Sequence, residues 1–142
     1  MFITIYYGGE NCVSHESFIN LFLPPPCMLL SLDEYKKVRP CFFGDFYPLT
    51  DFTKSLNEWM VYQFHRIDLK EGMVLFFRRP FNDQIDQNVG LKGLDEKATF
   101  ELLFEDIGVV VNKTGKELMV TGVSVRILER RESLLTTYKK SE

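Results

Sequence analysis

The stretch Glu58–Phe77, which reads EWMVYQFHRIDLKEGMVLFF, decides the fold of this chain. In its first half Met60, Tyr62 and Phe64 alternate with other residues, and side chains two positions apart lie on the same face of a strand. In its second half Met73–Phe77 is apolar at every position, which is typical of a strand at the centre of a sheet. The stretch therefore predicts two strands.

Toward the C-terminus similar short β-branched and aromatic runs repeat, each closed by Gly, Pro, Asn or Asp. These further runs are Val89–Leu94, Thr99–Phe104, Val109–Val111, Glu117–Val120, Val123–Glu129 and Leu134–Tyr138. Residues Asn112–Gly115 lie between two of them and predict a tight hairpin loop with Gly115 in a left-handed conformation. About seven strands at intervals of about ten residues predict a mainly β fold, a two-sheet antiparallel β-sandwich with Greek-key-like topology.

Toward the N-terminus the sequence predicts one short helix. Ser31–Glu34 has the spacing of a capping box, and Pro40 disfavours helical geometry at the residue before it, so we expect a helix over Leu32–Val38. Residues 1–30 show no sustained period, and the three prolines at 24–26 predict an extended connector. We therefore divide the chain into a lead-in (1–30), a short helix with an aromatic connector (31–56) and the antiparallel β-sandwich (57–142).

Composition and charge exclude several classes of protein. The chain has 142 residues, of which 45% are hydrophobic and 26% charged, as in one folded globular domain. It is too short for a (β/α)8 barrel, which needs roughly 200 residues or more. The net charge of −3 argues against nucleic acid or an anionic membrane surface as a partner. No run approaches the roughly 20 apolar residues that a membrane-spanning helix requires.

The cysteines and the N-terminus bear on the cellular compartment. Cys12, Cys27 and Cys41 are odd in number and widely spaced, so we interpret them as free thiols, which slightly favours the cytoplasm. The N-terminus lacks the charged start, apolar stretch and cleavage site of a signal peptide. Neither observation decides the compartment, which stays open.

Few side chains offer acid–base chemistry. Asp95 and Asp106 stand at turn positions, where an aspartate usually hydrogen-bonds the nearby backbone. Asp45 lies among aromatic residues, and its role is open at this stage. His65 alternates with the apolar face of its strand, so we expect a solvated or edge histidine. The sequence thus predicts no coherent pair of catalytic carboxylates.

The sequence gives no sign of a metal or nucleotide cofactor. Cys12 and His15 have metal-ligand spacing, but no second Cys/His pair completes the four ligands of a zinc site. No glycine-rich phosphate loop is present, so we expect no cofactor. Arg78 and Arg79 stand beside phenylalanines, and in an acidic chain we interpret them as a strand end at which one arginine pairs with a carboxylate.

Six short blocks of the chain occur in a characteristic order: YKKVRP at 35–40, GDFYPLT at 44–50, WMVYQF at 59–64, GMVLFFRRP at 72–80, LKGLD at 91–95 and TGKELM at 114–119. Together they resemble the C-terminal part of α-galactosidases of glycoside hydrolase family 36 and their relatives. The resemblance covers about residues 33–140 and leaves residues 1–30 unmatched.

The resemblance implies that catalysis and structural support belong to different domains. In such enzymes a (β/α)8 barrel carries two catalytic aspartates, and a C-terminal antiparallel β-sandwich packs against it. By that resemblance the chain corresponds to the sandwich with the final barrel helix, and no residue here inherits a catalytic role. The parent protein would be a retaining glycoside hydrolase, and the chain alone would not be catalytic. The resemblance thus predicts a structural accessory domain whose partner is the barrel.

The aromatic segment, by which we mean Val38–Phe52, is the natural contact region. Its rings are those of Phe42, Phe43, Phe46, Tyr47 and Phe52. So many rings in a short irregular stretch need burial, so we expect them to form an exposed apolar patch when the barrel is absent. In the assembled protein, the barrel or a second copy of the chain in a homo-oligomer would cover this patch.

Two alternative functions stay open. A stand-alone carbohydrate-binding module would use Trp59 or neighbouring aromatics to stack on a sugar, although Trp59 and Tyr62 lie on opposite strand faces and at most one can join a given platform. A small enzyme would need Asp45 with a second carboxylate. The candidate interdomain or sugar contacts are Phe43, Asp45, Tyr47 and Trp59.

Overall fold

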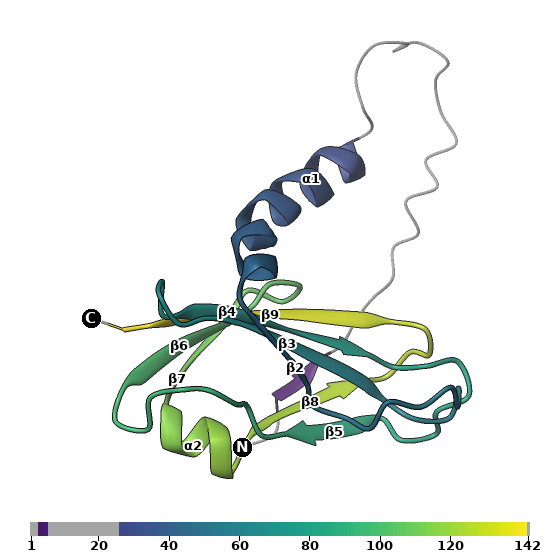
Figure 1. Ribbon diagram of the computed structural model, residues 1–142. Helices are drawn as coiled ribbons and strands as arrows, with labels where there is room; N and C mark the ends of the chain where they lie inside the picture. The colour runs from purple at the N-terminus through teal and green to yellow at the C-terminus, as the bar shows by residue number, and fades with distance from the viewer. Residues whose placement is uncertain (1–2, 6–25, 142) are drawn as a thin grey trace.

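The computed structural model describes residues 3–5 and 26–141, with side chains over residues 32–141. Its larger sheet has six strands in the order β2-β3-β4-β9-β6-β7, and every neighbouring pair is antiparallel (Figure 1). The strands are β2 (Asp45–Pro48), β3 (Met60–Arg66), β4 (Glu71–Phe77), β9 (Ser133–Lys140), β6 (Thr99–Phe104) and β7 (Val109–Thr114).

The smaller sheet lies below the larger one in Figure 1 and has the order β1-β8-β5. Strand β8 (Val123–Ile127) pairs antiparallel with β5 (Asp86–Val89) and parallel with β1 (Ile3–Ile5). The predicted class, a mainly β fold of two sheets with a short N-terminal helix, is confirmed. Of the predicted lead-in (1–30), the structure describes only β1 and residues 26–30, so that part of the division stays a prediction.

The main hydrophobic core lies between the two sheets. Val61, Phe76 and Leu102 of the larger sheet and Val123 and Val125 of the smaller one are at most 2% exposed and belong to one cluster. Aliphatic and aromatic side chains on the facing sides of two sheets exclude water from the space between them. The sandwich is held together chiefly by this interior.

Helix α1 (Pro26–Val38) begins earlier than predicted and ends where the sequence indicated. Proline is tolerated in the first turn of a helix, where its missing N–H would have no partner in any case, so Pro26 starts the helix instead of preceding it. Pro40 falls in a short 3-10 helix, η1 (Arg39–Phe43), that leads into β2. Within the described residues, no helix is long and apolar enough to cross a membrane.

The predicted hairpin at Asn112–Gly115 is wrong. Strand β7 continues to Thr114, and helix α2 (Gly115–Val120) follows. The Thr114 hydroxyl accepts from the backbone N–H of Glu117 at 3.2 Å, and the Glu117 carboxylate accepts from the N–H of Thr114 at 2.8 Å. This reciprocal cap stabilises a helix start, so the segment that resembled a strand is helical.

Glycines decide two further details. Gly115 does not have a positive φ; it is required because a Cβ there would lie 2.0 Å from the backbone oxygen of Asp95. Strand β5 ends at Val89 instead of running over the predicted Val89–Leu94, and Gly93 in that stretch has a φ of 73°. A left-handed residue turns the chain and is incompatible with a continuing strand.

Candidate functional site

The outer face of the larger sheet carries a row of contacting aromatic rings. The ring of Phe46 in β2 lies 5.4 Å from that of Tyr62 and 5.2 Å from that of Phe64, both in β3. Phe42 of η1 lies 5.0 Å from Phe64, and Tyr62 lies 6.3 Å from Phe77 of β4. We call these five rings the aromatic face.

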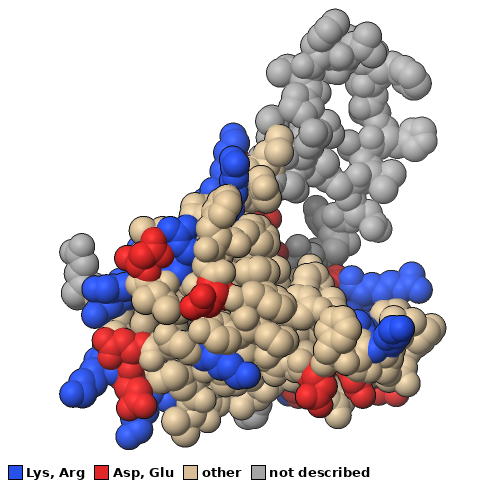
Figure 2. Space-filling view, in the orientation of Figure 1, with Lys and Arg blue, Asp and Glu red and all other residues tan. Residues whose placement is uncertain are grey.

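Phe42 and Phe46 of the aromatic face are exposed to solvent, and its other three rings are half-buried. Phe46 is 52% exposed, and the adjoining Phe43 and Phe52 are 75% and 89% exposed. The predicted exposure of the aromatic segment is therefore confirmed. In the view of Figure 2 the middle of the molecule is largely uncharged, and charged side chains gather toward its two ends.

The four predicted contact residues fall into two places. Phe43 ends η1, and Asp45 and Tyr47 lie in β2, where the Asp45 carboxylate accepts from the Tyr47 hydroxyl at 3.5 Å. Trp59 is 4% exposed, and its indole N–H donates to the backbone oxygen of Gln84 at 3.1 Å. The structure brings the first three together at one sheet edge, and it leaves Trp59 no free ring face for stacking on a sugar. Their contact with another domain stays a prediction.

The two turn aspartates have structural hydrogen bonds. The Asp95 carboxylate accepts from the backbone N–H of Lys97 at 3.1 Å, which confirms its expected turn role. The Asp106 carboxylate accepts from the backbone N–H of Leu135 at 3.1 Å and so ties the β6–β7 turn to β9. Burial raises the pKa of Asp106 above its ordinary value.

The inner face of β3 carries a buried polar network that sequence reasoning missed. The amide of Gln63 donates to the hydroxyl of Tyr138 at 2.9 Å and to the backbone oxygen of Lys92 at 2.8 Å. The ring nitrogen Nδ1 of His65 lies 3.0 Å from the same hydroxyl. The expected solvated or edge role of His65 is wrong, because this residue is 4% exposed. Tyr138, near the end of β9, supplies the partner that makes its burial possible.

Burial also changes the protonation of this network. It lowers the pKa of His65, an effect that the Asp45 carboxylate partly opposes, and it raises the pKa of Tyr138. Both shifts keep the groups neutral at physiological pH. In sequence, the only signal was that Gln63 and His65 share a strand face with Val61, which predicts burial once that face is recognised as the inner one.

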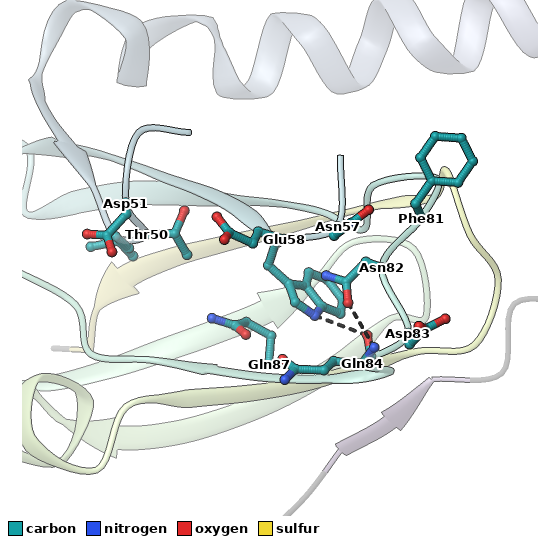
Figure 3. Close-up of a pocket in the computed structure, with 11 residues that line it drawn as sticks. Thr50, Asp51, Asn57, Glu58, Phe81, Asn82, Asp83, Gln84 and Gln87 are labelled. Carbon is teal, nitrogen blue, oxygen red and sulfur yellow. Dashed lines mark hydrogen bonds between the residues drawn. The ribbon is translucent and has the colours of Figure 1, made fainter. Parts of the chain in front are cut away.

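An open cleft of about 630 Å³ is formed by residues 49–51, 57–59, 81–84 and 87 (Figure 3). Its polar side chains include three carboxylates, four carboxamides and the hydroxyl of Thr50, and no lysine or arginine among the described residues lines it. The ring of Phe81, 58% exposed, stands at one end and projects above the other side chains. Sequence reasoning missed the cleft, although the amide-rich run at 82–88 was a usable signal.

Two arginines hold the chain around the cleft. Arg78 is 4% exposed, and its guanidinium donates to the backbone oxygens of Asn82 at 2.9 Å and Ile127 at 3.0 Å. Arg79 donates to the backbone oxygens of Thr53 at 3.0 Å and of Ser55. The expected arginine–carboxylate pair is wrong for both, because carbonyls of irregular chain take their hydrogen bonds. These contacts order the segments before and after the cleft walls.

The described residues offer little for metal or thiol chemistry. Over residues 3–5 and 26–141, no group of three His, Cys, Asp or Glu side chains is placed to hold a metal ion. Cys41 is a buried free thiol whose pKa burial raises to about 11, so it is protonated and unreactive at neutral pH. Cys12 and His15 lie outside the described residues.

Comparison with known proteins gives a match among solved structures. No protein-family model matches the chain, and no curated protein matches it. Among solved structures it matches the GH36 α-galactosidase AgaA from Geobacillus stearothermophilus, a doubly substituted enzyme in complex with stachyose. The TM-score is 0.66 and the identity 28%, and the match covers 81% of this chain but 16% of the enzyme chain.

The match bears directly on the resemblance stated above. The predicted resemblance to glycoside hydrolase family 36 is confirmed, and the matched part is consistent with the C-terminal domain of that enzyme. The chain spans only about a sixth of the enzyme's length, so the enzyme contains other domains that this match does not cover.

Proposed function

We propose that this chain is a non-catalytic accessory domain of an α-galactosidase-like glycoside hydrolase, and that its aromatic face packs against a (β/α)8 catalytic barrel. The observation that carries the proposal is the exposed aromatic face on a chain that matches 16% of a larger GH36 enzyme. Catalysis belongs to the barrel in this proposal, and the sandwich contributes stability and position.

The energetics of the aromatic face support such a contact. Fully burying a phenylalanine side chain stabilises a structure by roughly 1.5–3 kcal/mol relative to leaving it in water. Phe46 of the aromatic face and the adjoining Phe43 and Phe52 all have more than half of their surface exposed. Contiguous apolar surface of this kind marks an interaction site more often than it marks free surface. A partner that covers these rings would gain several kcal/mol.

The position of the contact residues fits the same partner. Strand β2 is at one end of the sheet order, so its outer edge and its rings are accessible together. Asp45 and Tyr47 lie on that strand, and Phe43 precedes it with only Gly44 between them, so polar groups lie on the same edge strand as Phe46. An apolar centre with a polar rim is the usual anatomy of a stable interface.

A chimera tests the proposal. The segment of the Geobacillus stearothermophilus enzyme that matches this chain is replaced by residues 26–142, and α-galactosidase activity is measured on p-nitrophenyl α-galactoside. We expect a soluble, active chimera, and we expect the same chimera with Phe43→Asp and Phe46→Asp to lose most of its activity or solubility. The isolated chain should release no p-nitrophenol above the blank.

A matched variant keeps the result interpretable. Ile67→Asp changes an exposed apolar residue, 61% exposed, outside the aromatic face and should leave the chimera active. If the chimera that carries both phenylalanine substitutions behaves like the one with Ile67→Asp, Phe46 of the aromatic face and the adjoining Phe43 do not contact the barrel. Hydrolysis by the isolated chain that disappears in Asp45→Asn would instead establish a catalytic role for Asp45.

A further inference from the structure

We propose that the cleft formed by residues 49–51, 57–59, 81–84 and 87 binds a neutral oligosaccharide, with Glu58 and Asn57 taking its hydroxyls and Phe81 packing on a sugar ring. This inference goes beyond the accessory role and does not depend on it. Trp59 belongs to the cleft wall, but its ring is buried, so the stacking partner in this proposal is Phe81.

The charge of the cleft limits the class of ligand. Asp51, Glu58 and Asp83 are its ionisable lining residues, so an anionic ligand would be repelled. The Asp83 carboxylate is 2.6 Å from the guanidinium of Arg130, which offsets one of the three negative charges. Among the described residues, neither Asp51 nor Glu58 has an ion-pair partner, and a carboxylate can accept two ligand hydroxyls at once.

The carboxamides distinguish a hydroxylated ligand from a cationic one. Asn57, Gln84 and Gln87 line the cleft, and a carboxamide carries both donors and an acceptor. An ammonium group carries donors only and would leave the amide N–H groups without partners. A sugar hydroxyl both donates and accepts, so it matches amides and carboxylates together.

Asn82 gives a second and independent indication of a ligand. It is 1% exposed, and its side-chain oxygen accepts from the backbone N–H of Gln84 at 2.8 Å. That bond fixes the amide orientation and turns the nitrogen away from Gln84, toward the Glu58 side of the cleft (Figure 3). The nitrogen has no hydrogen-bond partner among the described residues. A buried donor without an acceptor is costly, and a ligand hydroxyl at the cleft floor would supply that acceptor.

The walls of the cleft are ordered before any ligand binds. Arg78 and Arg79 anchor the surrounding irregular segments, and the indole N–H of Trp59 donates to the backbone of Gln84. Pre-ordered walls lower the entropy lost on binding. Phe81 stands at the end of this ordered site with an exposed ring, and the apolar face of a pyranose packs well on such a ring.

Titration of the full chain with raffinose, stachyose and maltotriose, followed by calorimetry and by amide chemical shifts, tests the proposal. We expect at least one of them to bind with a Kd on the order of 1 mM and to shift amides in segments 49–51, 57–59 and 81–87. Phe81→Ala and Glu58→Gln should each weaken binding about tenfold. Both residues are exposed, so these variants should keep the fold.

Matched controls separate the cleft from the rest of the surface. Phe43→Ala and Glu129→Gln make the same changes at exposed positions outside the cleft and should leave the Kd unchanged. The proposal is overturned if none of the three sugars binds, if Phe81→Ala and Glu58→Gln bind as the unchanged chain does, or if trilysine or trigalacturonate binds the cleft instead. Failure here would leave the chimera result intact, because that experiment reports on the aromatic face.

Discussion

The two faces of the six-stranded sheet differ in how completely their side chains are covered. On the inner face, Gln63 and His65 are at most 4% exposed although they are polar. On the outer face, Phe46 is 52% exposed although it is apolar. The difference indicates that a side chain of this sheet is buried where other residues pair with it or cover it. Tyr138 satisfies the polar inner residues, whereas the described residues supply no full cover for the outer rings.

The first prediction compares truncations of a side chain on the inner face and one on the outer face. Phe76 is fully buried between the sheets, and its neighbour Phe77 points to the outer face and is only partly buried. Phe76→Ala should lower the free energy of unfolding by about 3–5 kcal/mol, because it leaves a cavity in a packed core. Phe77→Ala should cost roughly 1 kcal/mol. Urea denaturation of both variants checks this, and equal losses would show that the two faces are packed alike.

The second prediction concerns the hydroxyl at the centre of the buried network. Tyr138→Phe keeps the ring but removes the partner of the His65 ring nitrogen and one partner of the Gln63 amide. We expect the free energy of unfolding to fall by about 1–3 kcal/mol, the usual cost of a buried polar group left unpaired. Tyr62→Phe on the outer face is the control and should stay within about 0.5 kcal/mol of the unchanged chain.

The third prediction concerns the pH dependence of stability that the buried His65 causes. Burial holds the pKa of His65 below its ordinary value of 6.5, so the unfolded chain takes up a proton at a higher pH than the folded chain does. The free energy of unfolding is therefore unaffected by protonation of His65 above about pH 6.5, and it falls as the pH drops from 6.5 toward the lower pKa of His65 in the folded state. Unfolding by urea between pH 7.5 and 5 measures this slope.

A variant assigns that slope to one residue. His65→Gln removes the titrating group from the inner face, so its stability should change less with pH over the same window. His15, the other histidine, remains in this variant as an internal control. The interpretation fails if His65→Gln retains the full slope, because the proton would then be taken up elsewhere.

Much of the fold could be predicted from the sequence because strand periodicity is local. The alternation of Met60, Tyr62 and Phe64 placed β3 correctly, but it did not say which of its faces is the inner one. That choice depends on Tyr138, which lies 75 residues from Gln63 in the chain. Thr114 and Glu117 show a different failure, since the sequence carries their capping-box spacing but the prediction rested on the β-prone residues on either side.

The candidate site was predictable in part for the same reason. Phe43, Asp45 and Tyr47 are close in sequence, so their shared place at the β2 edge followed from local reasoning. The cleft combines segments about 25 residues apart, as in the hydrogen bond from Trp59 to Gln84. Its floor depends on how Arg78 and Arg79 hold irregular chain, which no periodic pattern reports.

The last prediction has the smallest effect on stability and tests the outer face. Phe43 is 75% exposed, so Phe43→Ser should change the free energy of unfolding by no more than about 0.5 kcal/mol. The same change should lower self-association of the isolated chain, measured by sedimentation velocity over a range of concentrations, because it removes apolar surface that a second copy would cover. Ile67→Ser is the matched control and should affect neither quantity. A large loss of stability in Phe43→Ser would mean that the ring packs within this domain. Phe43 would then not be available for contact with a partner.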